Sequence, residues 1–327
     1  VQHLWPLTVG GVELQMDAVS AYFRRRGHDV TLWTAALPRA SRKVLPDGRT
    51  VIGFGTGHVP APFWRINALW KFAQAYRHVP SPRGVDVVFS PDPLLATAHL
   101  LRGTGVPVVY CPGGTVVGST PWDGSPRPPK SRWRRVVATA TTPLGQYLAA
   151  ERFALQRAAG IIAVSEPVRR QMLQAHPGCA GRIRVVYNGY EPADFRRKVW
   201  SADSAQAANG PVPFTCICVA RLHPIKNLPH LLQAWALVRH PAKRLWLVGE
   251  GGERAALEEL TRRLRLEESV EFLGERRDVP DLLVQADVLV LPSRYEACGM
   301  AVIEAMGAGL PVITSRNSPG LAEVGAS

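Results

Sequence analysis

The sequence predicts an α/β protein with two domains, each a parallel β-sheet that carries helices on both faces. Three observations lead to this prediction. Short apolar runs of strand length recur along the chain, helix-length amphipathic stretches lie between most of them, and a polar, small-residue stretch divides the runs into two series. Such alternation is typical of parallel sheets covered on both faces, and 327 residues suffice for about two domains. We therefore expect one domain at 1–200, a linker at 201–213 and a second domain at 214–327.

The first series opens with a helix that Gly27 closes, because glycine readily ends a helix in the left-handed conformation. Helices are expected at 12–26, 94–102 and 133–159. Short apolar runs predict strands at 29–34, 85–89, 107–111 and 160–164. Ser165 fits the N-cap of a further helix that ends near His176.

The second series follows the linker and repeats the same alternation. Its apolar runs predict strands at 214–219, 245–248, 270–273, 288–291 and 311–314. Helices fit between them at 228–239, 254–264, 279–285 and 300–308. Two such series predict two Rossmann-like domains, and ligands of these sheets bind beyond the carboxyl ends of the strands. A cleft between the two domains is thus the expected site.

Charge is distributed unevenly over the chain, whose net charge is +13. Residues 1–200 carry 26 Lys and Arg against 11 Asp and Glu, whereas residues 201–327 carry 13 against 15. A basic half suggests an anionic partner: a membrane surface, an acidic substrate or nucleic acid. An Arg-rich codon usage explains the excess equally well. No nucleic-acid-binding motif accompanies the charge, so we expect no nucleic-acid partner.

Composition excludes several classes of protein. No uncharged apolar run approaches the roughly 18 residues that span a bilayer. Five scattered cysteines lack the two-residue gap of a zinc or redox pair, which fits a reducing cytosol rather than a disulfide-stapled secreted protein. They are Cys111, Cys179, Cys216, Cys218 and Cys298.

One glycine motif resembles a dinucleotide fingerprint but does not complete it. In "LVGEGGERAALEEL" a strand is followed by Gly249 and Gly251, and the third glycine of the fingerprint would fall on Arg254. A dinucleotide-dependent oxidoreductase is therefore disfavoured. A tight turn at the mouth of the site, with Gly249 beside the ligand, is the expected role.

The strongest local signal is "PSRYEACGMAVIEAMGAGLPVI", which places Glu296 in a loop and Glu304 eight residues later inside a helix. The start of that helix, with Gly299 followed by Met300 and Ala301, offers unpaired N–H groups to an anion. Gly299 lets a phosphate approach the backbone closely. Glu304 is placed to accept hydrogen bonds from sugar hydroxyls. The alternative is an ordinary loop glutamate and a solvated helix glutamate.

Two further segments supply cations and small residues. "VARLHPIKNLPHLL" puts Arg221 and Lys226 in a loop after a strand, where they can clamp a diphosphate. They are otherwise two solvated loop cations. In "LTVGGVEL", Gly10 and Gly11 precede the first helix and would let a ligand lie against the backbone.

These segments, in this order, resemble the retaining glycosyltransferases of family 4, which have the GT-B fold of two Rossmann-like domains facing each other across a cleft. The pair Glu296 and Glu304, with seven residues between, is the most specific feature, and "RIRVVYNGYEPADF", "LVGEGGERAAL" and "ADVLVLPSRYE" extend the resemblance over most of the chain. The resemblance implies a nucleotide-sugar donor bound mainly by the second domain. It also implies an acceptor, a glycan or a lipid-linked sugar, bound by the first.

The resemblance also implies roles for individual residues. Arg221 and Lys226 would contact the donor diphosphate. Glu296 would contact hydroxyls of the transferred sugar, and Glu304 would hold the ribose. Gly11 would approach the phosphates from the first domain. Many relatives carry a histidine after the strand at 107–111, where this chain has Gly113, so no catalytic histidine is carried over. Relatives also continue past "LAEVG", so the chain resembles a family member that ends early.

The mechanism expected from these residues is electrostatic. Cleavage of a sugar–phosphate bond leaves negative charge on the diphosphate, which Arg221, Lys226 and the helix start at Gly299 would stabilise. No Asp-x-Asp pair occurs in the chain, so we expect no metal site and no cofactor besides the donor, a UDP-sugar rather than a GDP-sugar. A sugar-nucleotide epimerase of the same shape and an inactive partner subunit are the alternatives. We expect a cytoplasmic protein whose basic first domain docks on anionic membrane.

Overall fold

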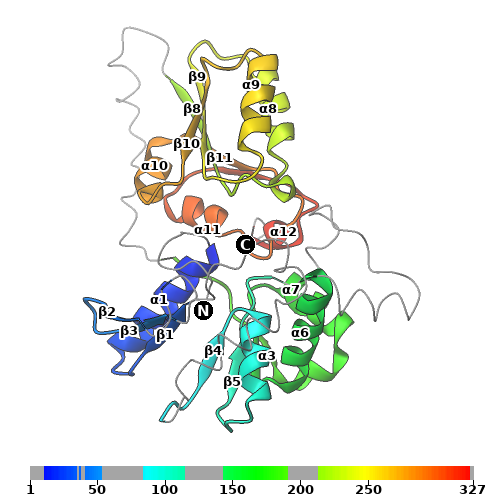
Figure 1. Cartoon of the computed structure of the whole chain (residues 1–327). Helices are drawn as coiled ribbons and strands as arrows, with labels where there is room; N and C mark the ends of the chain where they lie inside the picture. Colours follow the sequence, from blue (N-terminus) through cyan, green and yellow to red (C-terminus); the bar gives the residue numbers. More distant parts are fainter. Residues whose placement is uncertain are drawn as a thin grey trace. The chain divides into compact units, whose positions relative to one another are not determined.

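The structure is a computed structural model that describes residues 11–34, 37, 41–53, 84–114, 143–190 and 213–324. The described residues form two compact units, one up to Tyr187 and one from Asn188 (Figure 1). The division comes earlier than the predicted linker at 201–213, of which only Pro213 is described. Tyr190 explains the difference, because a Cβ on Gly307 would lie 2.6 Å from the Tyr190 ring. The chain thus packs with the second unit before the predicted linker begins.

The first unit contains a four-stranded parallel sheet in the order β4-β5-β6-β7. Its strands are β4 (Val88–Ser90), β5 (Val108–Tyr110), β6 (Gly160–Ala163) and β7 (Ile183–Val185). The helices between them are α3 (Pro93–Leu101), α6 (Pro143–Arg157) and α7 (Glu166–Ala175), and a 3₁₀ turn at Pro177–Arg182 precedes β7. Asp92 caps α3 and Ser165 caps α7, as predicted for Ser165. The described part of the predicted helix at 133–159 is α6.

A smaller sheet in the first unit was not predicted in full. It has the order β1-β3-β2, with β1 (Thr31–Thr34) parallel to β3 (Thr50–Gly53) and β2 (Arg42–Val44) antiparallel to it. Every residue of β2 is exposed, so this edge strand carries no hydrophobic pattern. β3, the central strand, has only two apolar residues, Val51 and Ile52, between Thr50 and Gly53, and was not predicted either.

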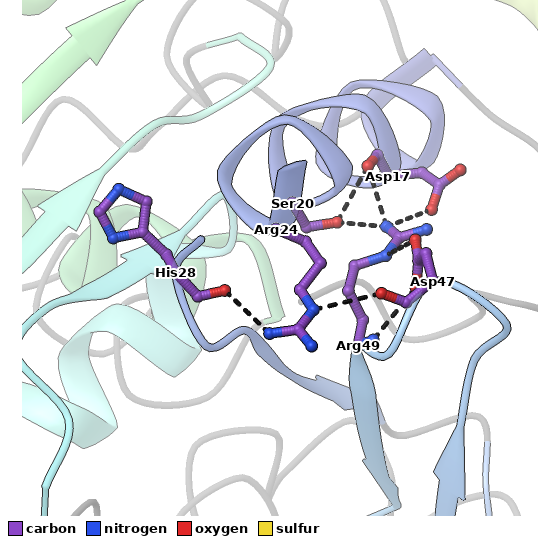
Figure 2. A network of polar contacts seen from close by, with 6 residues as sticks. All are labelled: Asp17, Ser20, Arg24, His28, Asp47 and Arg49. Atoms are coloured by element: carbon purple, nitrogen blue, oxygen red, sulfur yellow. Dashed lines mark hydrogen bonds and ion pairs between the residues drawn. The ribbon is translucent and has the colours of Figure 1, made fainter. Parts of the chain in front are cut away.

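A polar network holds this hairpin against the first helix, α1 (Gly11–Arg25) (Figure 2). The Arg49 side chain, 8% exposed, donates to Asp17 Oδ1 at 2.7 Å, to Ser20 Oγ at 2.6 Å and to Asp47 Oδ2 at 2.6 Å. Arg24 on α1 donates in turn to the carbonyl oxygen of Asp47 at 3.2 Å. The network ties the helix to the hairpin with charge-assisted hydrogen bonds.

The second unit is a five-stranded parallel sheet in the order β10-β9-β8-β11-β12. Its strands are β8 (Phe214–Val219), β9 (Lys243–Val248), β10 (Val270–Gly274), β11 (Val288–Leu291) and β12 (Val312–Thr314). Its helices are α8 (Leu228–Leu237), α9 (Arg254–Arg263), α10 (Val279–Gln285), α11 (Met300–Gly307) and α12 (Pro319–Val324), and a 3₁₀ turn (Pro224–Lys226) precedes α8. All five predicted strands and four predicted helices are present, and α12 is an addition.

Helices cover both faces of this sheet (Figure 1). Right-handed crossovers place α8 and α9 on one face, because the chain moves outward from β8 to β10. The chain then returns across the sheet, which puts α10 and α11 on the other face, and α10 contacts α11 as α8 contacts α9. The α/β class with parallel sheets is thus confirmed. The central strand β8 is buried along its middle four residues and anchors one continuous hydrophobic core.

The five cysteines are free and buried. Burial raises the pKa of Cys216 to about 12 and also raises the pKa of Cys298. These thiols therefore stay protonated at neutral pH. None of the helices in the described ranges is long and apolar enough to cross a membrane.

Candidate functional site

The predicted site residues of the second unit follow strands that are neighbours in the sheet. Arg221 and Lys226 follow β8, Gly249 follows β9, and Glu296 follows β11. Because β8 lies between β9 and β11 and all three are parallel, their following loops leave the same edge of the sheet. The fold therefore gathers residues that lie up to 75 positions apart in the sequence, from Arg221 to Glu296.

An ion pair joins two of the predicted catalytic residues. The Lys226 ammonium donates to Glu296 Oε1, and the two side chains are only 17% and 13% exposed. Ser293, which is fully buried, donates its hydroxyl to the same oxygen at 2.9 Å. Because both side chains are little exposed, solvent screens the attraction between these two charges less than in an ordinary surface salt bridge. Sequence analysis predicted both charged residues but neither their pairing nor Ser293.

Backbone contacts fix the loop that carries Glu296. The N–H of Arg294 donates to the carbonyl of Ile225 at 2.8 Å, which ties this loop to the one that carries Lys226. On the other side, the N–H of Gly320 donates to the carbonyl of Glu296 at 3.1 Å. A Cβ on Gly320 would lie 2.5 Å from the Ala297 carbonyl oxygen, so only glycine permits this approach. The start of α12 is therefore a support of the site that sequence analysis missed.

The N-cap of α11 lies three residues after Glu296. Gly299 is the N-cap, has φ +75° and caps without a side chain, so its left-handed conformation favours glycine. A Cβ there would also lie 2.5 Å from Leu321 Cδ2. The N–H groups of Met300 and Ala301 belong to the first turn and have no intrahelical acceptor. They carry the positive end of the helix dipole. Glu304 lies one turn further along α11 and is half-buried.

Gly249 lies in the tight turn that the sequence predicts after β9, and the backbone around it is closely packed. Its φ is +133°, and a Cβ there would lie 2.1 Å from the carbonyl oxygen of Ala220. Gly251 is equally confined, because its Cβ would lie 2.2 Å from the Leu222 carbonyl oxygen. The two glycines allow the turn after β9 to pack against the segment after β8. Arg221 lies in that segment between the two carbonyls and is exposed.

The remaining predicted site residues belong to the first unit. Gly10 lies outside the described residues, and Gly11 is the exposed first residue of α1. Gly113 packs beside this helix: a Cβ there would lie 2.5 Å from Val12 Cγ2. A larger residue at 113 would therefore clash with the Val12 side chain unless that side chain moved. Within the described ranges, no group of three or more His, Cys, Asp or Glu residues is arranged to hold a metal ion.

Two family models match the chain and between them cover nearly all of it. The model described as Glycosyltransferase Family 4 matches residues 9–194, and the model described as Glycosyl transferases group 1 matches residues 213–326. Glycogen synthase of Mycobacterium tuberculosis is 30% identical over a match of 342 aligned positions, gaps included, that covers 97% of this chain and 77% of that protein. An uncharacterized glycosyltransferase of Methanocaldococcus jannaschii is 31% identical over 171 residues, 47% of this chain and 42% of the relative. The match likewise spans less than half the length of an uncharacterized glycosyltransferase of Haemophilus influenzae, 32%, and of the putative glycosyltransferase EpsF of Bacillus subtilis, 45%.

Solved structures agree with this assignment at the level of the fold. Sucrose-phosphate synthase from Thermosynechococcus elongatus superposes with a TM-score of 0.74 at 21% identity, over 95% of this chain and 77% of that one. HepE of Anabaena, solved in complex with UDP and glucose, gives a TM-score of 0.68 at 22% identity, over 99% and 81% of the two chains. Both have the GT-B fold. The chain therefore has the GT-B fold and belongs to glycosyltransferase family 4.

Proposed function

We propose that this chain transfers a sugar from a nucleotide-sugar donor to an acceptor hydroxyl, with retention of the anomeric configuration. The observation that carries the proposal is the shielded Lys226–Glu296 pair beyond the carboxyl ends of β8 and β11, with Glu296 three residues before the N-cap of α11. HepE, which shares the fold, is solved with UDP-glucose. A cation, a carboxylate and a helix start in one place match a donor with a diphosphate and a hydroxylated sugar.

We assign each of these residues to one part of the donor: the diphosphate, the transferred sugar or the ribose. Arg221, Lys226 and the first-turn N–H groups of α11 stabilise the negative charge that the diphosphate gains as the sugar–phosphate bond breaks. Glu296 accepts hydrogen bonds from hydroxyls of the sugar, and Glu304 from the ribose. The acceptor oxygen attacks from the face that the diphosphate leaves, and the departing phosphate oxygen takes the acceptor's proton. Gly11 approaches the phosphates from the first unit.

Donor binding tests this proposal. We expect titration calorimetry to detect UDP-glucose and UDP, and to find GDP and GDP-sugars weaker by at least about tenfold, a difference of about 1.4 kcal/mol. Because cations and a helix dipole are proposed to stabilise the diphosphate in place of a divalent ion, the affinity for UDP-glucose and the rate of sugar transfer should persist after exhaustive chelation. Loss of both, restored by magnesium or manganese, would contradict the electrostatic scheme. Turnover of the donor without any acceptor would instead favour the epimerase, and binding without turnover an inactive partner subunit.

The acceptor is proposed to be a glycan or a lipid-linked sugar that the first unit meets at an anionic membrane. The basic excess of residues 1–200 supports this, as do the exposed aromatic rings of Tyr22 and Phe23 beside Arg25 and Arg26 at the end of α1. Two stretches that suggest interfacial binding by sequence, 63–78 and 127–135, mix aromatic with basic residues and lie outside the described residues. The alternative is that their aromatic residues pack into the domain core and their arginines are solvated.

Vesicle sedimentation measures this docking. We expect binding to anionic but not to zwitterionic vesicles, weakening as salt is raised. Neutral replacement of Arg132, Arg134 and Arg135 should reduce binding about 100-fold, because each basic residue near an anionic leaflet contributes about 1 kcal/mol. The matched control is neutral replacement of Arg262 and Arg263, two exposed residues on α9 of the near-neutral half. Equal binding to both kinds of vesicle would refute anionic docking and favour a soluble acceptor.

A further inference from the structure

We infer that Ser293 is a positioning residue that makes Glu296 present one particular oxygen, Oε2, to the sugar of the donor. The inference rests on the proposed function and assigns a role to a residue without charge. Ser293 itself would not touch the donor. It would act through the carboxylate that does.

The hydrogen bonds of the Glu296 carboxylate all converge on one of its oxygens. Oε1 accepts from the Lys226 ammonium and from the Ser293 hydroxyl. Oε2 has no hydrogen-bond donor among the residues that the structure describes. The side chain is still 13% exposed, so a ligand can approach it. Oε2 is therefore the oxygen left to accept from sugar hydroxyls.

Ser293 is better suited than Lys226 to fix the orientation of the carboxylate. The terminal torsion of a glutamate is broad, so an ion pair with a flexible lysine alone leaves the carboxylate plane free to rotate about that torsion. Ser293 follows β11 directly after Pro292 and is fully buried. The next residue, Arg294, is fixed by its backbone hydrogen bond to Ile225. A hydroxyl held this firmly sets the rotation of the carboxylate plane, and with it the direction in which Oε2 points.

This arrangement separates recognition of the sugar from recognition of the nucleotide. If Ser293 orients Glu296, its hydroxyl matters only when a sugar is attached to the diphosphate. If Ser293 merely supports the loop, its removal weakens binding of the nucleotide and the nucleotide-sugar alike. The ratio of the two affinities therefore distinguishes positioning from structural support.

The test compares Ser293→Ala with wild type in binding UDP-glucose and UDP. We expect the affinity for UDP-glucose to fall about tenfold, the effect of one lost hydrogen bond to a charged group, and the affinity for UDP to change less than twofold. The matched control is Ser318→Ala, since Ser318 is also fully buried in the second unit and its hydroxyl has no hydrogen-bond partner among the described residues. Ser318→Ala should leave both affinities within twofold of wild type.

Each other result overturns the inference. Unchanged UDP-glucose affinity in Ser293→Ala, or equal losses for UDP-glucose and UDP, would show that Ser293 does not position Glu296, while the proposed function would stand. Failure of the wild-type protein to bind either compound would refute the proposed function and the inference with it. Urea unfolding of both serine variants checks that any loss of affinity occurs in folded protein.

Discussion

Glu296→Gln and Lys226→Ala are each expected to lower the rate of sugar transfer at least about 100-fold, relative to a wild-type protein that transfers sugar. Removal of one preorganised group that stabilises developing charge costs two to three orders of magnitude in rate, about 2.7–4 kcal/mol of transition-state stabilisation. Gln keeps the size of Glu296 and can still accept from Ser293, so the fold should persist. Initial rates with UDP-sugar donors, together with circular dichroism of each variant, measure both effects.

A double variant that removes both charges of the ion pair separates loss of activity from loss of stability better than either single variant. Removing one charge leaves the other in a site that is less than one-fifth exposed, so each single variant should lose stability, though less than the roughly 3–5 kcal/mol of a fully buried pair. The double variant Lys226→Met/Glu296→Gln removes both charges and should regain most of that stability while staying inactive. Glu259→Gln, which breaks an exposed pair with Arg262, should change neither rate nor stability appreciably. Near-normal rates in either single variant would refute the site assignment.

Much of the fold follows from local sequence because the buried strands of the second unit carry their own signal. β8 and β11 are continuous apolar runs, and a central parallel strand is buried on both faces. Elements without such a run are missed. β2 is exposed throughout, β7 has three residues with an exposed arginine in the middle, and α12 has six residues. Such short segments form because neighbouring elements hold them. They are too short to show the hydrophobic periodicity from which a strand or a helix is predicted.

The candidate site follows from sequence only as far as residue types allow. Arg221, Lys226 and Glu296 stand out because charged residues after apolar strands are easy to recognise. The contact between Lys226 and Glu296 depends on the strand order, which places β8 beside β11 although two strands and three helices lie between them in sequence. Ser293 gives no signal, since a serine before a charged loop is common. Its importance appears only when its hydroxyl is seen to share Oε1 with Lys226.

Glycines show the same limit, because a sequence cannot tell a glycine that a ligand needs from one that the backbone needs. Gly249 is predicted to lie in a tight turn beside the ligand, and the atoms that a Cβ there would meet are backbone atoms of Ala220 and Arg221. Gly320 was not predicted at all, although it packs on the carbonyl of Ala297 next to Glu296. Close approach of two backbones leaves no trace in composition or periodicity. Substitution by alanine separates the two explanations for Gly249.

Gly249→Ala is expected to reduce the free energy of unfolding of the second unit by about 3–5 kcal/mol, which combines backbone strain at φ +133° with a direct clash. The clash has no easy relief. The Ala220 N–H is bonded to the Val248 carbonyl at 2.9 Å and the Gly249 N–H to the Gly274 carbonyl at 2.7 Å, so both segments are held. Gly252→Ala, in the same turn, adds its methyl to open space and should change stability by less than about 0.5 kcal/mol. Urea unfolding of the two variants measures the difference. Wild-type stability in Gly249→Ala, with UDP affinity lost, would show instead that the ligand requires this glycine.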